Sequence, residues 1–285
     1  MHFDSLSVLH LQGRKIHQRT LFRRVPTMTR TSRYGKRFAA GACAAAALAM
    51  ISAASPAQAG DDDYWTLGAG VAYGPEFLGS DEYEFSPVPL VDVKYGHFFA
   101  NTGDGIGFTA YESPQFTAGA ALNWMGGYDD DDVPTGIEEV DGSLGVSLFV
   151  STELYGFEGK LTATQAVTET DRGLLIEAGI GYPIHVTDRL VLSPGIGTSW
   201  ANDKYMDGYF GINASEAAAS GLAFYEPSGG FRDVEASITA RYRITDSINA
   251  IGLIGVTQLI GDAADSPLVE DEASLKAVLG VSYTF

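Results

Sequence analysis

The chain has 285 residues, of which 45% are hydrophobic, and a formal net charge of −18. Nine of its 18 basic residues and one of its 36 acidic residues precede Gly60, so residues 60–285 carry a net charge of −26. Such an acidic segment argues against binding to nucleic acid, because the phosphates would repel it. Cys43 is the only cysteine, so residues 60–285 can form no disulfide and no cysteine-based metal or catalytic site.

The first 59 residues have the organisation of a secretory leader. A basic region precedes an apolar, alanine-rich run at 38–54, and small residues occupy the cleavage positions up to Ala59. We therefore predict a signal peptide over residues 28–59, cleaved after Ala59, with residues 1–27 an over-extended gene start. A lipoprotein signal at Cys43 is disfavoured, because only about five apolar residues precede it. The basic residues are Arg30, Arg33, Lys36 and Arg37.

From Tyr64 onward, apolar side chains alternate with small or polar ones in about a dozen stretches. Residues two apart share one face of an extended chain, so each stretch predicts a β-strand with one apolar and one polar face. No stretch reaches the roughly 18 apolar residues of a membrane-spanning helix, so strands must provide any membrane crossing. The candidate strands are residues 64–73, 87–95, 97–102, 105–111, 116–126, 143–153, 156–164, 173–182, 190–201, 233–244, 248–259 and 274–285.

The connections between these strands alternate in length. Short turns on one side and longer loops on the other are typical of an outer-membrane barrel with both termini in the periplasm. We therefore predict an all-β fold, a transmembrane antiparallel up-and-down β-barrel of about 12 strands (10–14) formed by residues 60–285. A soluble β-sandwich gives no reason for such a two-sided rule. The long connections span 74–86, 127–142, 202–232 and 260–273, and two brief ones, at 103–104 and 165–172, fall on the same side.

The last stretch, residues 275–285, shows the clearest alternation in the chain. Its bulky residues share one parity and would face lipid, and the chain ends on an aromatic residue suited to the membrane interface. A strand of a soluble sheet could alternate in the same way, and the signal peptide favours the membrane. We interpret these residues as the C-terminal assembly signal for the barrel-assembly machinery: Leu279, Val281, Tyr283 and Phe285.

Charged residues within the strands take the parity opposite to the bulky apolar residues. A Lys or Arg that faces lipid at the bilayer midplane costs about 2–4 kcal/mol, so these side chains should point into an aqueous lumen. Parity alone does not exclude a soluble barrel with the two faces exchanged. The predicted lumenal charges are Glu158, Lys160, Glu177, Glu235, Arg241, Arg243 and Lys276.

Several motifs resemble the MipA/OmpV family of outer-membrane proteins. They are Pro87-Val-Pro89 with Tyr95, Phe98-Phe99 and Gly105-Ile-Gly107; Trp200, Tyr209-Phe-Gly-Ile212, Ser220-Gly-Leu222, Tyr225 and Gly229-Gly230; and a loop motif, Gly261, Asp262, Ala263, Ala264, Asp265, Ser266 and Pro267. The resemblance covers nearly all of residues 60–285. It implies a barrel whose best-described member is a scaffold that links a membrane-bound lytic transglycosylase to a murein synthase. Other members of the family are described as porin-like or as adhesins.

The sequence offers no catalytic, cofactor or metal site. His97 and His185 fall at periplasmic turns or their flanks, and neither has a partner at catalytic or metal-ligand spacing. Asp129 to Asp132, with Glu138, Glu139 and Asp141, could bind Ca²⁺ or bridge to lipopolysaccharide through divalent ions. Val133-Pro134 break EF-hand spacing, so a hydrated acidic loop is the preferred interpretation. Asp262 and Asp265 are expected to cap turns. Segment 209–225, with Ala217 to Ala219, is expected to form a short helix or a loop folded against the barrel mouth. We therefore predict a protein that is not an enzyme.

Two functions from different classes stay open. In the first, the periplasmic turns form a non-enzymatic scaffold for murein-remodelling enzymes, although short turns offer little of the ~800 Å² per partner that a stable interface buries. In the second, the barrel is a cation-preferring diffusion channel, with lumen space left by Gly68, Gly70, Ser193, Gly195 and Gly197. A surface adhesin is a further alternative. The expected surroundings in each case are outer-membrane lipid and lipopolysaccharide.

Overall fold

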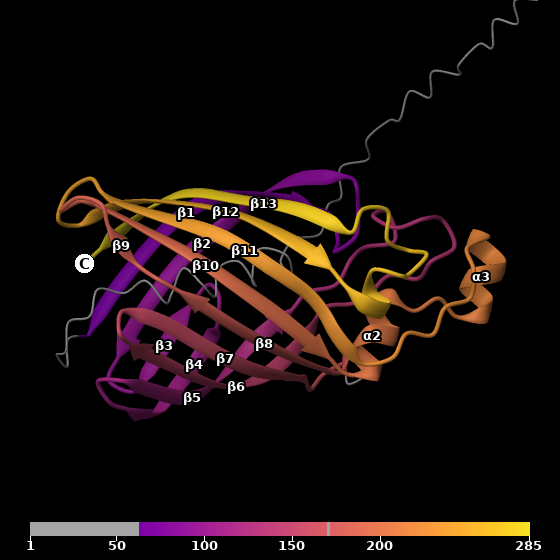
Figure 1. Cartoon of the computed structure of the whole chain (residues 1–285), viewed down its shortest axis with the longest axis horizontal. Coiled ribbons are helices and arrows are strands. Elements are labelled where there is room, and N and C mark those ends of the chain that lie inside the picture. The colour runs from indigo at the N-terminus through magenta and orange to yellow at the C-terminus, as the bar shows by residue number, and fades with distance from the viewer. Residues whose placement is uncertain (1–62, 170–171) are drawn as a thin grey trace, which may run out of the picture. The chain divides into compact units, whose positions relative to one another are not determined.

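The computed structural model describes residues 63–169 and 172–285, which form an antiparallel β-barrel (Figure 1). The predicted leader, its cleavage site and Cys43 lie outside the described residues. The strands are β1 (Tyr64–Pro75), β2 (Tyr83–Tyr95), β3 (Phe98–Asn101), β4 (Gly105–Glu112), β5 (Phe116–Met125), β6 (Ser143–Leu154), β7 (Phe157–Ala166), β8 (Leu174–Gly181), β9 (Ile184–His185), β10 (Leu190–Ala201), β11 (Gly230–Arg243), β12 (Ile248–Leu259) and β13 (Ala273–Thr284). The helices are α2 (Asp203–Phe210), α3 (Ala214–Ser220) and the 3-10 helix η2 (Gly261–Ala263).

The sheet closes on itself because its first and last strands pair. β1 runs antiparallel to β13, with Thr66 opposite Thr284 and Tyr73 opposite Ala277. β8 and β9 both pair with β10 and are two parts of one wall strand, so the barrel has twelve wall strands. The predicted strand number is therefore confirmed. An even number brings both ends of the barrel chain to one rim, where the Phe285 amide donates to the Trp65 carbonyl (2.9 Å).

Two prolines explain the interruption between β8 and β9. Gly195 of β10 lies opposite Gly181, which places Pro194 opposite Tyr182. The Tyr182 amide donates to the Pro194 carbonyl (3.1 Å), but proline has no N–H with which to return a bond. Pro183 removes a second donor directly after it, so the ladder stops for two residues and resumes at Ile184.

The barrel wall is apolar outside and more polar inside. On β13, Leu279 is 72% exposed on the outer surface, whereas Lys276 and Ser282 on the other face are buried. The outward-facing apolar residues belong to all parts of the wall, including Leu148 on β6, Ile196 on β10 and Ile254 on β12. Such a belt has the character of a lipid-facing surface. Within the part of the chain that the structure describes, no helix is long and apolar enough to cross a bilayer.

Long connections gather at one rim of the barrel and short turns at the other. Figure 1 shows α2 and α3 at the end of the barrel away from the C-terminus. One two-residue turn at the opposite rim is Tyr155-Gly156, in which both residues have positive φ (56° and 81°), the conformation of a type I′ hairpin. The two-sided rule of loop lengths is confirmed.

Two strands begin earlier than the sequence predicted. β2 starts at Tyr83 rather than at residue 87, and β11 starts at Gly230 rather than at residue 233. Pro87 in the first case and the Gly229-Gly230 pair in the second are residues that usually mark loops. Proline is tolerated on a strand edge that needs no N–H donor. Pro87 lies on such an edge, because this part of β2 has a strand partner on one side only.

The hairpin formed by β3 and β4 is much shorter than its neighbours. β3 pairs with β2 only from Asp92 to Tyr95, and the Thr102 amide then donates to the Val91 carbonyl (3.0 Å). Beyond that point, residues 83–90 of β2 are paired with β1 on one side and with no strand on the other. The barrel wall therefore has a gap above this hairpin.

Candidate functional site: the lumen and its cap

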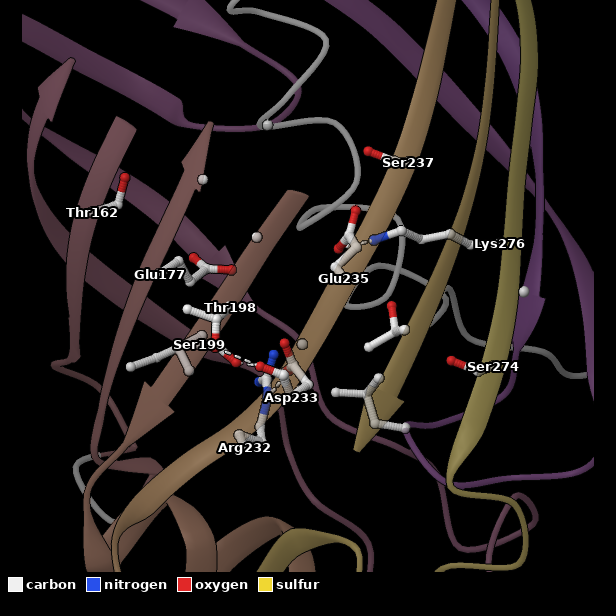
Figure 2. Close-up of a pocket in the computed structure, with 18 of the residues that line it drawn as sticks. Thr162, Glu177, Thr198, Ser199, Arg232, Asp233, Glu235, Ser237, Ser274 and Lys276 are labelled. Atoms are coloured by element: carbon white, nitrogen blue, oxygen red, sulfur yellow. Dashed lines mark hydrogen bonds and ion pairs between the residues drawn. The ribbon is translucent and has the colours of Figure 1, made fainter. Parts of the chain in front are cut away.

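A cavity lies in the lumen, between the strand walls and the loops of the long-loop rim. It offers about 250 Å³ to the centres of water molecules, enough for several waters. Figure 2 shows its polar wall, built by β7, β8, β10, β11, β12 and β13. The hydroxyl residues that line it include Ser86, Ser147, Thr162, Thr164, Ser193, Thr198, Ser199, Ser237, Thr239, Thr257 and Ser274. These side chains can hydrogen-bond to water or to a polar solute.

Two lysines on opposite walls of the cavity are neutralised by carboxylates. The Lys276 Nζ atom of β13 lies 2.6 Å from Glu235 Oε2 of β11, and both side chains are almost completely buried. Lys160 of β7 forms an ion pair with Asp104, the last residue of the β3–β4 turn, and its Nζ also lies 5.7 Å from the centre of the Phe149 ring. A buried charge is costly unless it is paired, so each contact compensates a lysine charge while it links β13 to β11 or β7 to the β3–β4 turn.

A third network joins the barrel to the structure above it. Arg232 and Asp233 are both buried, and Arg232 Nε lies 2.6 Å from Asp233 Oδ2. The Ser199 hydroxyl donates to the same carboxylate oxygen (2.6 Å), and Arg232 also donates to the Tyr205 hydroxyl of α2. A β-bulge explains how two consecutive residues reach the interior, because Ser199 lies opposite Asp233 while Trp200 lies opposite Phe231.

The structure separates the predicted lumenal charges into three groups. Glu158, Lys160, Glu177, Glu235 and Lys276 line the cavity, and Figure 2 shows Glu177 between Thr162 and Thr198. Arg241 lies deeper in the barrel, within electrostatic range of Asp92 and Glu158. Arg243 is exposed at the periplasmic rim and donates to the Asp188 carbonyl of the neighbouring turn. Their roles stay predictions.

Five charged residues that line the cavity were missed from the sequence: Glu76, Glu84, Asp104, Arg232 and Asp233. Asp233 is the first residue of the predicted strand 233–244 and shares the parity of Glu235, so its lumenal position could have been inferred from the sequence. Arg232 depends on the bulge, which has no evident signal in the sequence. Asp104 lies in a turn, where an exposed position is the usual expectation. Only the closed barrel brings Asp104 next to Lys160.

Helix α2 covers the extracellular mouth of the lumen. Its N-cap is Asn202, whose side chain accepts from the Tyr205 amide (3.1 Å) and from the Leu174 amide at the start of β8 (2.9 Å). Met206 and Phe210, one helical turn apart, are fully buried and pack with residues of β5, β7 and β12. Burial raises the pKa of the Tyr205 and Tyr209 phenols, so both stay neutral at physiological pH. The Tyr209 hydroxyl donates to the Gly126 carbonyl (2.5 Å).

The family-like motifs between Tyr209 and Gly229 and the loop motif Gly261 to Pro267 meet in this same structure, which we call the cap and define as residues 202–229 together with 260–268. The other motifs lie on the barrel strands. The Ser266 hydroxyl donates to the Phe210 carbonyl (2.7 Å), and the Tyr225 hydroxyl donates to the Asp262 carbonyl (2.8 Å). The Asp262 side chain accepts from the Ser228 amide (2.8 Å), so it caps a neighbouring loop rather than its own turn. The loop motif Gly261 to Pro267 therefore makes hydrogen bonds that connect the segments of the cap.

The sequence predicted only one of the two α-helices of the cap, and that one only as an alternative to a loop. The segment 209–225 was expected to form a short helix or a loop folded against the barrel mouth, and α3 occupies its middle. α3 begins with a capping box between Asn213 and Glu216 and ends at Gly221, whose φ is +81°. α2 was not predicted at all.

The four glycines and Ser193 that were proposed to leave lumen space have two different positions. Ser193, Gly195 and Gly197 on β10 do line the cavity. Gly68 and Gly70 on β1 do not. A Cβ atom at either position would lie less than 3 Å from the β13 backbone, so these two glycines permit close strand packing instead.

No arrangement for catalysis or metal binding is apparent at the cavity. His97 and His185 are at the periplasmic end of the barrel, outside the cavity lining. Among residues 63–169 and 172–285, no three His, Cys, Asp or Glu side chains gather in a geometry suited to a metal ion. The chemistry that the lumen does offer is hydrogen bonding and charge compensation.

The family model described as "MltA-interacting protein MipA" matches residues 67–285 of the chain, which is nearly the whole barrel and its cap. The chain belongs to the MipA family. Its localisation follows from the membership and from the lipid-facing belt of a transmembrane barrel: the protein is located in the outer membrane.

Two curated relatives extend over most of this MipA-family chain. The MltA-interacting protein of Escherichia coli K12 is 25% identical over 251 residues, which cover 84% of this chain and 97% of the relative. A second protein of the same strain, YiaT, whose name assigns it provisionally to the outer membrane, is 25% identical over 229 residues, 77% of this chain and 90% of its own length. Both are named as interacting or outer-membrane proteins and not as enzymes.

Among solved structures, an outer-membrane channel from Pseudomonas putida F1 has a TM-score of 0.44 and 10% sequence identity. The alignment covers 81% of this MipA-family chain and all of the channel.

Proposed function

We propose that this MipA-family protein is a non-enzymatic scaffold that holds murein-remodelling enzymes, a lytic transglycosylase and a murein synthase, at the periplasmic face of the outer membrane. The observation that carries the proposal is the cap. Met206, Phe210 and Ile212 are fully buried beneath or within it, so the extracellular mouth is filled with packed side chains. A barrel closed in this way is better suited to present a surface than to conduct solutes.

The name of a relative supports the choice of partner. The Escherichia coli protein that aligns over 84% of this chain is named for its interaction with MltA. An interaction of the same kind by this chain would have to use the periplasmic rim, because a peptidoglycan-processing enzyme works on that side of the membrane.

The periplasmic rim offers exposed aromatic side chains for such a contact. Tyr155, at the tip of the β6–β7 turn, is 96% exposed, and the neighbouring rings of Phe157 and Tyr182 pack 4.9 Å apart. Tyrosine and phenylalanine are enriched in protein interfaces. Since each turn is short, the contact surface must be the ring of turns as a whole if it is to reach the ~800 Å² per partner of a stable interface.

Site-specific photo-crosslinking in cells tests this proposal. A photoreactive amino acid in place of Tyr155 or Thr245, in two different periplasmic turns, should form a crosslink to a lytic transglycosylase. The matched control is Ala218 on α3, which is exposed at the opposite rim and should not form one. If no periplasmic turn crosslinks to a transglycosylase that the same cells contain, the scaffold proposal is wrong.

The second candidate, a cation-preferring diffusion channel, is supported by one specific observation. The cavity beneath the cap is lined with hydroxyl groups and carboxylates, among them Glu158 and Glu177. If the protein is a scaffold, the intact chain should give no stable current in a planar bilayer. Removal of α2 and α3 (residues 203–220) should then open a cation-selective pore. Discrete currents from the intact protein, without any enzyme partner, would favour the channel.

A further inference from the structure

The gap in the barrel wall above the β3–β4 hairpin has defined borders. Its lower border is the turn at Thr102, whose hydroxyl donates to the Pro89 carbonyl (2.8 Å) and accepts from the Val91 amide (2.8 Å). Its sides are β2 and the end of β5 beyond Leu122, which lie three strand spacings, about 14 Å, apart where the two strand segments between them are missing. Above it, the loops after β1 and β5 meet where the Phe77 and Tyr128 rings pack 5.4 Å apart.

Two prolines remove the hydrogen-bond donors from the β2 side of the gap. In an antiparallel strand, the N–H and C=O of every second residue point to the same neighbour. Val91 directs these groups toward β3, so residues 89 and 87 direct theirs into the gap. Both are proline and have no N–H. The edge can therefore border hydrocarbon without leaving an amide donor unsatisfied at either position.

The same two prolines exclude strand addition as the use of this edge. A peptide that extended the sheet would need to accept from the N–H groups of β2, and those at residues 87 and 89 do not exist. A protein segment that pairs with the edge is accordingly a poor occupant of the gap.

The outer surface around the gap lies at the depth of the outer leaflet. Phe85 and Tyr95, both outward-facing and exposed, are ten residues apart on β2. In a strand tilted by about 40°, ten residues span about 25 Å, the height of the apolar band of such barrels. Tyr95 is at the periplasmic rim, so Pro87 and Pro89 lie in the half of the band that faces the cell exterior.

On its inner side the gap leads to the cavity and to an apolar part of the wall. The cavity lining includes Ser86 on β2, Asp104 at the lower border and Asn123 on β5. Next to Ser86 begins a continuous apolar strip that extends over four strands, an unusual feature inside a barrel with a polar lumen. The strip consists of Ala72, Val88, Leu90, Ile251, Leu253 and Val278.

We propose that the gap is a lateral port through which one acyl chain of an outer-leaflet lipid enters the cavity and lies against its apolar lining, to which the strip contributes Ala72 and Val278. An acyl chain makes no hydrogen bonds and requires none, and the port offers apolar contact from the outer belt to the inner wall. The port enters through the side wall, so the cap that covers the extracellular mouth does not block it. The proposal does not depend on the scaffold function.

Fluorescence quenching in lipid vesicles tests the port. The mature chain has no cysteine, so single cysteines can be placed and labelled with a small fluorophore at Val88 and Ser86, which face inward beside the gap. The vesicles contain phosphatidylcholine with a nitroxide on the acyl chain. The matched controls are neighbours on β11, which is paired on both sides: Ser237 faces inward and Ile238 faces lipid.

The port predicts that labels at Val88 and Ser86 lose much of their fluorescence, as the label at Ile238 does, whereas the label at Ser237 keeps its fluorescence. Ser86 is a small polar residue, so it provides a reporter if the Val88 variant fails to fold, and folding is checked by the heat-dependent migration of the barrel on gels. Labels at both positions that behave like Ser237 would overturn the proposal. Quenching by iodide in water without quenching by the lipid nitroxide would overturn it as well.

Discussion

At the scale of single residues, the lumen depends on charges that compensate one another in a confined space. Lys276 and Glu235 are both buried, and their contact of 2.6 Å is the closest link between β13 and β11, which are separated by β12. The second carboxylate oxygen, Glu235 Oε1, is buried and accepts no hydrogen bond within the described structure. Glu235 therefore relies on Lys276 for most of its stabilisation.

Replacement of Lys276 by Met should lower the free energy of unfolding by about 3–5 kcal/mol, because it leaves a buried carboxylate without its partner. Urea unfolding of the protein refolded into vesicles measures this difference. The double variant Lys276→Met/Glu235→Leu removes both charges and should recover most of the loss. A double variant as unstable as the single one would show that packing, and not charge, is responsible.

At the scale of elements, two extracellular loops are joined by acidic residues. The amides of Glu270 and Asp271, before β13, both donate to the Gly79 carbonyl in the β1–β2 loop (2.7 and 3.0 Å). Partial burial and a hydrogen bond with the Asp81 carboxyl raise the pKa of Glu270. A carboxyl whose pKa is higher in the folded state stabilises that state below its unfolded pKa, and this contribution is lost as the pH rises through the folded-state value.

The contact between these loops should consequently be firmer at acidic than at neutral pH. Limited proteolysis within residues 76–82, at pH 4 and at pH 7.5 with a protease active at both, should show slower cleavage at the lower pH. Glu270→Gln keeps the hydrogen-bonding shape without the charge and should remove most of the difference. An unchanged pH dependence in this variant would contradict the assignment to Glu270.

At the scale of the whole molecule, the closed barrel places each strand side chain either on the outer surface, against lipid, or in the barrel interior. The seam between β1 and β13 fixes that assignment, because a shift of one residue would exchange the two faces of the last strand. Leu279 then faces acyl chains and its neighbours Val278 and Gly280 face the interior. The acidic excess of the chain is kept in the lumen and the loops.

An arginine should therefore be tolerated on one face and not on the other. Leu279→Arg should lower the free energy of unfolding in vesicles by about 2–4 kcal/mol, as expected for a cation that faces lipid. Thr162→Arg places the same side chain in the water-accessible cavity and should have a much smaller effect. Equal losses for the two variants, measured by urea unfolding, would contradict the orientation of the wall.

The number of strands, their faces and the two-sided loop pattern could be predicted because each follows from local features. Alternation in Leu275 to Phe285 needs only the two-residue period of a strand, and the turn at Tyr155-Gly156 needs only its own φ angles. α2 could not be predicted in this way. Its apolar residues, Met206 and Phe210, are stabilised by the barrel mouth and not by helix propensity in an eight-residue segment.

The sequence by itself determined that the chain forms an outer-membrane barrel of about twelve strands, because hydrocarbon and water impose opposite requirements on alternate residues. Tertiary structure alone decided that the motifs around Tyr209, Tyr225 and Asp262 form one cap. It also decided that Pro87 and Pro89 border a gap, since the gap exists only where β3 and β4 stop short. Those contacts join residues far apart in the chain, and local periodicity carries no information about such distances.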